Sequence, residues 1–499
     1  MAFFRSSGVL LHPTSFPSPF GIGDLGSEAY QFVDFLATSR QSLWQILPLG
    51  TPGHGNSPYL AYSAMAGNPL LISPLQLKNF GLLSDADLAK VPEFPVDSVD
   101  FAAVEAFKQP LLEKAFAQFQ ASGADQQPGF TEFCKAQAHW LDDYALFMAL
   151  KAEQGGQPWT EWEEPLRSRQ PAALAQAKAR LERAIAYQQF LQYEFFRQWE
   201  MLKQYANERG IQIIGDIPIY VAHDSADVWS NPKNFCLNPQ TGQPSLMAGV
   251  PPDYFSATGQ LWGNPVYAWD QLEQTQFHWW IRRFEVLLQL VDIVRIDHFR
   301  GLQAYWAVPE GEDTAINGTW IEAPGAALFE AVKAQLGQLP IIAEDLGTIT
   351  PEVNALREQF DFPGMKILQF AFDSGSENPY LPFNYEGRNW VVYSGTHDND
   401  TTVGWFAARD GGAQAHVATY LGQVSDDGIH WDLIRLASSS VANQAIFPLQ
   451  DLLGLGSDAR MNIPGLAENN WGWRYRHDSL DASVSDHLRQ VTEYYGRDR

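Results

Sequence analysis

The sequence predicts an α/β fold, a (β/α)8 TIM barrel that spans residues 1–499 as a single unit. Eight short apolar runs recur along the chain between helical stretches. Each run is nearly continuous in hydrophobicity, as parallel strands buried on both faces are. Strands that alternate with helices indicate a parallel sheet, and eight of them indicate closure into a barrel. The predicted strands are residues 8–11, 42–47, 212–217, 292–296, 341–343, 365–370, 390–394 and 444–447.

A doubly wound open sheet is the alternative arrangement of such elements. In that fold a GxGxxG motif commonly follows the first strand, and none follows residues 8–11 here. The barrel is therefore favoured. Only about 50 residues follow the last predicted strand, whereas a β-sandwich needs roughly 100. We expect no C-terminal β-sandwich.

A large insertion is expected between the second and third strands. Residues 75–204 read as a mostly helical insertion subdomain, in which Ser84 with Asp87 resembles the capping box that opens a helix. The clearest helix covers residues 185–208 and ends before Gly210. Its apolar residues repeat at helical spacing and predict a face packed in the core: Leu191, Phe195, Trp199, Leu202 and Ala206.

A second insertion, residues 221–270, is rich in Pro, Gly, Asn and aromatic residues and shows little periodicity. Such a segment predicts a long ordered loop at the carboxyl ends of the strands, and long ordered loops in compact domains are usually functional. Within it, residues 249–264 carry exposed aromatic residues between Gly249 and Gly263. Prolines that limit backbone freedom and glycines that permit hinging predict a lid.

Composition excludes several classes of partner and site. The formal net charge of −25 argues against nucleic acid or an anionic membrane surface, because both attract clustered Lys and Arg. The two cysteines, Cys134 and Cys236, provide neither a disulfide framework nor a zinc site. The first residues lack a signal peptide, and no window reaches the roughly 20 apolar residues of a membrane helix. We expect a cytoplasmic protein without a cofactor, and a monomer is favoured over an oligomer.

Aromatic residues are abundant: 17 Trp, 18 Tyr and 31 Phe. A large core accounts for most of the Phe. Many Trp and Tyr, however, lie beside Gly, Pro, Asn and Asp in segments that read as loops. Such rings can stack on the apolar faces of a ligand, so composition alone leaves packing and ligand binding both open.

Polar residues follow four of the predicted strands. In such barrels the active site lies at the carboxyl ends of the strands, so these side chains should meet at one mouth. Two chemistries use a cluster of this kind, namely divalent-metal binding and glycosidic-bond cleavage between two carboxyl groups. The candidates are Asp216, Arg295, Asp297, His298, Glu344, Asp345, His397, Asp398 and Asp400.

Arg295 favours the second chemistry. It lies two residues before Asp297, so both side chains face the same side of a strand. A fixed cation is unfavourable inside a metal-binding cluster, but beside a nucleophile it keeps the carboxylate ionised. The aromatic loops also suit a sugar better than a metal. Glycoside chemistry is favoured, and metal-dependent chemistry stays an alternative.

Several segments carry a specific family resemblance. Three segments at strand ends resemble the amylomaltase branch (disproportionating 4-α-glucanotransferases, glycoside hydrolase family 77) of the α-amylase clan: VRIDHFRG, AEDLG and GTHDND. Three further segments resemble it too: SPYLAYSAMAGNPLLI at 57–72, AGVPPDYFSATGQLWGNPVY at 248–267 and MNIPG at 461–465. The resemblance runs in order from about residue 8 to residue 474. The helical insertion carries no motif of the family.

The resemblance implies an enzyme that moves α-1,4-glucan segments between glucans and maltooligosaccharides with retention of configuration. It implies that Asp297 is the nucleophile, Glu344 the general acid/base and Asp398 a carboxylate that stabilises the transition state. The cleaved glucosyl unit would lie among Asp216, Arg295, His298 and His397. The acceptor side and its lid would include Tyr59, Asp253, Tyr254, Phe255 and Trp262.

Alternatives remain at this stage. An α-glucan hydrolase would use the same residues, because partition of the intermediate between sugar and water depends on water exclusion, which no single residue reports. A catalytically silent glucan-binding protein is disfavoured by the three carboxylates. Asp345 and Asp400 read as structural residues rather than catalysts, with Asp345 as a helix cap or structural partner.

Overall fold

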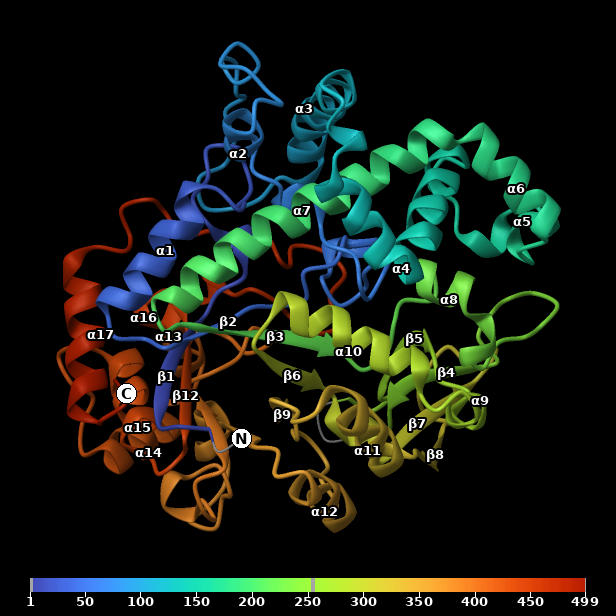
Figure 1. Cartoon of the computed structure of the whole chain (residues 1–499). Coiled ribbons are helices and arrows are strands. Elements are labelled where there is room, and N and C mark those ends of the chain that lie inside the picture. The colour runs from blue at the N-terminus through green and yellow to red at the C-terminus, as the bar shows by residue number, and fades with distance from the viewer. Residues whose placement is uncertain (1–2, 253–255, 499) are drawn as a thin grey trace.

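The barrel is present in the computed structural model, which describes residues 3–252 and 256–498. Its strands, several of which are labelled in Figure 1, pair in parallel in the order β10-β11-β12-β1-β2-β3-β6-β9. A hydrogen bond from the N–H of Ala343 to the carbonyl of Pro363 (2.9 Å) joins the last strand to the first. All eight predicted strands are confirmed, with small shifts at their ends: β1 (Ser6–Leu10), β2 (Leu43–Gln45), β3 (Gln212–Pro218), β6 (Ile293–Asp297), β9 (Ile341–Ala343), β10 (Gly364–Ile367), β11 (Trp390–Tyr393) and β12 (Gln444–Pro448).

Burial explains why these runs form strands. Every residue of β1 and of β12 is buried, as expected where helices cover one face and the barrel interior the other. Close packing between β1 and β2 depends on Gly8, because a Cβ there would lie 2.2 Å from the carbonyl oxygen of Leu43.

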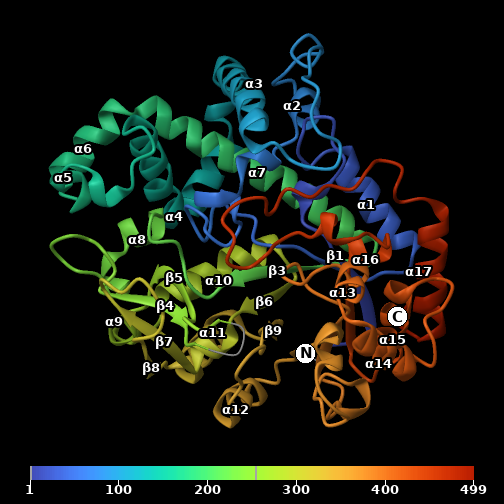
Figure 2. The same ribbon diagram turned by 180° about the vertical axis from the view of Figure 1, so that it is seen from behind.

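Helices surround the strands (Figure 2). The connection from β10 to β11 is the exception, since it contains only short 3-10 turns. In the part of the chain that the structure describes, no strand follows β12. The helices outside the second and third strand connections are α1 (Ser27–Thr38), α11 (Gly325–Leu336), α12 (Pro351–Gln359), α13 (Thr402–Ala407), α14 (Gly411–Leu421), α15 (Ile429–Ser439), α16 (Leu449–Leu452) and α17 (Ala482–Tyr494).

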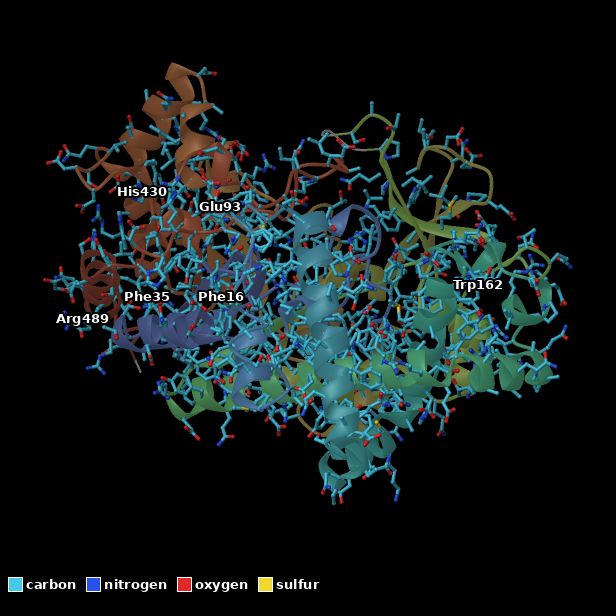
Figure 3. The ribbon with its side chains drawn as sticks, turned by 90° about the horizontal axis from the view of Figure 1, so that it is seen from above. Phe16, Phe35, Glu93, Trp162, His430 and Arg489 are labelled. Atoms are coloured by element: carbon cyan, nitrogen blue, oxygen red, sulfur yellow. The ribbon has the colours of Figure 1, made fainter. Side chains whose placement is uncertain are left out.

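Between β2 and β3 the chain is largely helical and extends to one side of the barrel, so that Trp162 and Arg489 lie at opposite ends of the molecule (Figure 3). The predicted apolar face of α7 is buried, and Gly210 adopts a left-handed φ of 75° after the helix. That residues 75–204 form a subdomain stays a proposal. The helices here are α2 (Pro74–Asn79), α3 (Phe101–Ala121), α4 (Pro128–Glu153), α5 (Glu164–Arg167), α6 (Pro171–Arg180) and α7 (Glu182–Glu208).

The helix start expected at Ser84 is wrong. The N–H and hydroxyl of Ser84 both donate to Oδ2 of Asp87, at 2.8 and 2.7 Å, but the chain forms turns there. The local hydrogen bonds of a capping box can form without a helix, because Ser and Asp make the same bonds in turns.

A second sheet, which the sequence did not predict, lies beside the barrel. It is antiparallel, with the order β5-β4-β7-β8. Two of its strands fall within residues 221–270, where only loops were expected. Besides β6 and α11, the helices and strands between β3 and β9 are α8 (Ala226–Ser230), β4 (Leu246–Val250), β5 (Gln260–Pro265), α9 (Trp269–Gln274), α10 (His278–Leu290), β7 (Ala304–Pro309) and β8 (Thr319–Glu322).

The glycines expected to act as hinges have another role. Gly249 lies in β4 and Gly263 in β5, so neither lies in a free loop. A Cβ at Gly249 would lie 2.4 Å from the carbonyl oxygen of Gln260, so glycine lets the two strands approach. Gly263 has a φ of 77°, which an L side chain rarely adopts.

Among the described residues, no helix combines the length and the apolar character needed to cross a bilayer.

Candidate active site

Four strands deliver the predicted side chains to one mouth of the barrel. Asp216 lies in β3 and pairs in register with Arg295 of β6, while Asp297 is the last residue of β6. Glu344 follows β9 directly, and His397 with Asp398 lies in the turn after β11. Parallel strands present their carboxyl ends at one face, so the site is assembled from residues far apart in sequence.

Arg295 joins two of the carboxylates. Its Nη1 donates to Oδ2 of Asp216 at 2.6 Å and to Oδ1 of Asp297 at 3.0 Å. The side chains of Arg295 and Asp216 are 4% and 0% exposed, whereas that of Asp297 is 31% exposed. Burial raises the pKa of Asp216, and Arg295 acts in the opposite direction. Asp297 is therefore partly exposed and lies directly beside a buried cation.

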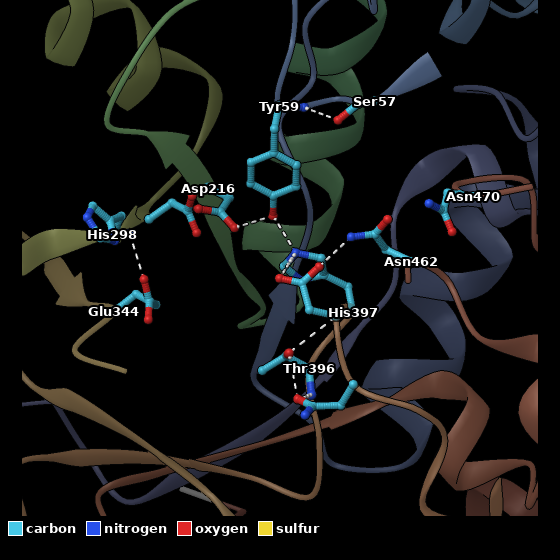
Figure 4. Close-up of polar contacts among 12 residues, drawn as sticks. Ser57, Tyr59, Asp216, His298, Glu344, Thr396, His397, Asn462 and Asn470 are labelled. Atoms are coloured by element: carbon cyan, nitrogen blue, oxygen red, sulfur yellow. Dashed lines mark hydrogen bonds and ion pairs between the residues drawn. The ribbon is translucent and has the colours of Figure 1, made fainter. Parts of the chain in front are cut away.

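Tyr59 connects this pair to the other side of the mouth (Figure 4). Its hydroxyl donates to Oδ2 of Asp216 at 2.8 Å and lies 2.9 Å from Nε2 of His397. The hydroxyl has one proton, so Nε2 of His397 must be the donor in the second bond. The two rings stack with centroids 5.3 Å apart, and Trp471 packs on Tyr59 at 5.7 Å. These contacts fix the orientation of the His397 ring.

Glu344 lies in a different environment from Asp297. Its Oε2 accepts the N–H of His298 at 2.6 Å and its Oε1 that of Leu346 at 3.0 Å. Burial raises the pKa of Glu344 to about 8; Arg295 opposes the rise and Asp297 adds to it. At neutral pH this carboxyl is therefore mostly protonated. His298 has a φ of 51°, a conformation that is uncommon for a residue with a side chain and is found often at functional sites.

Asp398 is held by His397, which was predicted for the site, and by Asn462 and Arg460, which were not. Nδ2 of Asn462 donates to its Oδ1 at 2.6 Å, and Nε2 of His397 lies 3.4 Å from its Oδ2. Arg460 donates to the carbonyls of Asp398 and Asn462, at 2.6 and 2.8 Å. The side chain of Asp398 is 46% exposed, so it remains accessible at the mouth while one oxygen is fixed. The MNIPG segment contains Asn462 and was the available signal.

The residues expected around the lid are placed only in part. Trp262 lies in β5, and its ring meets that of His298 edge to face with centroids 4.9 Å apart. Asp253, Tyr254 and Phe255 lie outside the described residues. Of the two roles expected for Asp345, helix cap or structural partner, the structure shows the second. Its Oδ1 accepts the N–H of Met365 at 2.7 Å. Asp400 binds the Ser457 hydroxyl at 2.7 Å.

Comparison with known proteins identifies the family. The family model described as 4-alpha-glucanotransferase matches residues 11–480. The chain belongs to the 4-alpha-glucanotransferase family. It is therefore an enzyme with 4-alpha-glucanotransferase activity, and the family that the sequence resembles is confirmed.

Relatives of this glucanotransferase cover its whole length. It is 60% identical to the 4-alpha-glucanotransferase of Synechocystis sp. over 99% of this chain and 98% of the relative. It is 49% identical to that of Thermus thermophilus, over 98% of each chain. The solved amylomaltase from Streptococcus agalactiae, in complex with acarbose, matches with a TM-score of 0.96 and 40% identity over 99% of each chain. The last match also supports the barrel fold.

Proposed function

We propose that the enzyme transfers an α-1,4-glucan segment to the 4-hydroxyl of a glucose or maltooligosaccharide acceptor by a retaining double displacement. Two observations support the substrate class: the aromatic residues around the mouth suit sugar rings, and a relative at 40% identity was solved with the oligosaccharide analogue acarbose. The cytoplasmic location and the monomeric state stay predictions.

In the first step, Asp297 is proposed to attack the anomeric carbon. A bond forms between that carbon and a carboxylate oxygen while the glycosidic bond breaks, and Glu344 gives its proton to the departing oxygen. In the second step, the acceptor's 4-hydroxyl attacks the same carbon and Glu344 takes the hydroxyl proton. The Asp297 bond breaks and the configuration is retained. Transfer to the donor's own non-reducing end would give a cyclic glucan.

The observation that carries this proposal is the contrast between the two carboxyl groups. Asp297 lies 3.0 Å from a cation, which suits an ionised nucleophile, whereas burial raises the pKa of Glu344 to about 8, which suits a proton donor. Carboxyl groups whose environments differ in this way commonly divide the acid and nucleophile roles.

Asp398 is proposed to bind hydroxyl groups of the cleaved glucosyl unit. Its Oδ1 is held by Asn462, so Oδ2, which lies 3.4 Å from Nε2 of His397, is the oxygen proposed to meet the sugar. His397 and Arg295 would bind other polar atoms of the same unit. Fixed charges and dipoles of this kind stabilise a transition state without reorganisation.

A trapping experiment tests the mechanism. With Glu344→Gln and an α-glycosyl fluoride, the first step proceeds without a proton donor, whereas the second lacks its base. The glycosyl-enzyme should accumulate, and mass spectrometry of peptides should place the sugar on Asp297. An adduct on another residue would contradict the assignment, and so would release of product with inverted configuration.

Product analysis separates transfer from hydrolysis. Maltotriose should give glucose together with a ladder of longer oligosaccharides. Glucose and maltose without longer products would instead identify a hydrolase. Amylose as donor tests cyclisation, since cyclic glucans resist an exo-acting amylase while linear products do not.

A further inference from the structure

Strands β9 and β10, where the barrel closes, are joined in an unusual way. One main-chain hydrogen bond crosses it among the described residues, from Ala343 to Pro363. The next donor on β10 is the N–H of Met365, which would meet a main-chain carbonyl in a regular parallel ladder. It instead donates to Oδ1 of Asp345 at 2.7 Å. A side-chain carboxylate therefore replaces a strand carbonyl directly after Glu344.

Glu344 is held from the opposite side by β6. Its N–H donates to the carbonyl of Ile296 at 3.0 Å, and its own carbonyl accepts the N–H of Phe299 at 3.1 Å. Both main-chain groups of Glu344 are therefore engaged by β6 and the turn that follows it. Asp345 provides the bond toward β10, so the turn that carries Glu344 is fixed between two strands.

Asp345 is itself supported. Nε of Arg357 lies 3.3 Å from its Oδ2, and the guanidinium lies 4.6 Å from the ring centroid of Trp390. The side chains of Asp345 and Arg357 are 5% and 6% exposed, so little water competes for these contacts. Gly364 is needed for the approach, because a Cβ there would lie 2.3 Å from Oδ2 of Asp345.

We propose that Asp345 is a positioning residue for the proton transfer performed by Glu344. This inference rests on the acid/base role proposed above for Glu344. Without the Asp345 carboxylate, the N–H of Met365 loses its acceptor and the turn after β9 loses its bond to β10. Proton transfer needs donor and acceptor atoms within about 2.6–3.2 Å, so a looser turn weakens the acid step before it affects steps that need no proton.

The test compares two donors in the first turnover. Release of the leaving sugar from maltotriose needs a proton, whereas fluoride departs from an α-glycosyl fluoride without one. Asp345→Ala should lower the first rate about tenfold more than the second, a part of the roughly 10²–10⁴-fold that general acid catalysis supplies. Asp345→Asn keeps a neutral acceptor oxygen. In this variant we expect the rate with maltotriose to fall about threefold more than the rate with the glycosyl fluoride, because bonds to charged acceptors are roughly twice as strong as neutral ones.

Asp292 offers a matched control. Its Oδ2 accepts the N–H of Ile213, at the start of β3, at 2.8 Å, and its Oδ1 lies 3.4 Å from Nζ of Lys203. It precedes β6 and therefore makes the same kinds of bond at the amino ends of the strands, away from the mouth. Asp292→Ala should lower stability and leave the ratio of the two donor rates unchanged.

The outcomes separate the two proposals. Equal loss on both donors in Asp345→Ala would show a purely structural role and overturn the inference. If that variant does not fold, Asp345→Asn decides, and an unchanged donor ratio overturns the inference in the same way. Glu344→Gln is measured alongside. If it shows the donor preference and the Asp345 variants do not, only the positioning role fails; if it shows none, the acid role of Glu344 fails first.

Discussion

Nη1 of Arg295 lies 3.0 Å from Oδ1 of Asp297, and the two residues are separated by a single residue of β6. Alternate residues of a strand face the same side, so the strand itself places a cation beside the proposed nucleophile. The same guanidinium nitrogen binds Asp216. One arginine thus balances two carboxylates, one fully buried and one partly exposed.

Asp297→Ala should lower transfer by on the order of 10³-fold or more while the protein stays folded, because the change removes the covalent step and little packing. The measurement is disproportionation of maltotriose by freshly purified protein, with thermal unfolding as the check on folding. Asp313→Ala, at an exposed site, is the control and should behave as wild type. Substantial remaining turnover in the Asp297 variant would refute the assignment.

Arg295→Met should both inactivate and destabilise the enzyme. It leaves Asp216 buried without its cation, and breaking a buried ion pair in this way typically costs about 3–5 kcal/mol. Urea unfolding measures the loss. The double variant Arg295→Met with Asp216→Leu should recover part of the stability but none of the activity. A single variant as stable as wild type would show that the pair contributes little to folding.

Activity should fall as pH rises through about 8. Burial raises the pKa of Glu344 to about 8, so its proton is lost there and the acid step fails. The basic limb of kcat/KM with maltotriose should therefore lie near pH 8. The first-turnover rate with a glycosyl fluoride should lack that limb, since fluoride leaves without a proton. If the basic limb lay at the same pH with both donors, it would not arise from loss of the Glu344 proton.

The pH dependence of the free energy of unfolding should also reflect the Glu344 carboxyl group. The folded enzyme holds the Glu344 proton to about pH 8, whereas the unfolded chain releases it near the ordinary value for glutamate, about 4.3. The unfolded state then binds fewer protons between these values, so this group lowers stability as pH rises across the window. Glu344→Gln removes the effect. Its stability relative to wild type should rise from pH 5 to pH 8.5 and then level off, as urea unfolding would measure.

Asn462→Ala should lower kcat about ten- to hundredfold, because it frees Asp398 to leave the position in which it meets the sugar. The fold should be unaffected, since Asn462 lies at the mouth and contributes no large apolar surface. Asn389→Ala removes an exposed amide that binds Asp361 and serves as the control. Unchanged kcat in the Asn462 variant would show that Asp398 keeps its position without the amide.

The sequence predicted the barrel because buried parallel strands leave a strong local signal. Residues 341–343 are wholly apolar and residues 445–447 are too, and a charged residue such as Glu344 stands out where it follows such a run. The antiparallel sheet leaves no such signal. Strands β4 and β5 contain Gly249 and Gly263 and have partly exposed residues, so their pairing depends on long-range contacts that a local pattern does not contain.

The same limit applies within the site. Asp216, Arg295, Asp297, Glu344 and Asp398 could be listed from strand ends, but the bonds between them could not. Asn462 lies 64 residues from Asp398 in sequence, and nothing local pairs them. The role of Asp345 across β9 and β10 likewise depends on where the chain turns after Ala343, which the AEDLG motif does not reveal.

The position of β1 has a consequence for synthesis of the chain. Within the sheet β1 lies between β2 and β12, and Ser6 pairs with Gln444. A ribosome that adds about 5–20 residues per second needs roughly 20–90 s to make the chain between these partners. Throughout that time one edge of β1 has no native neighbour, and an open strand edge favours pairing with other chains. Slower translation should therefore increase aggregation of this enzyme, and binding of β1 by a chaperone until β12 emerges should reduce it.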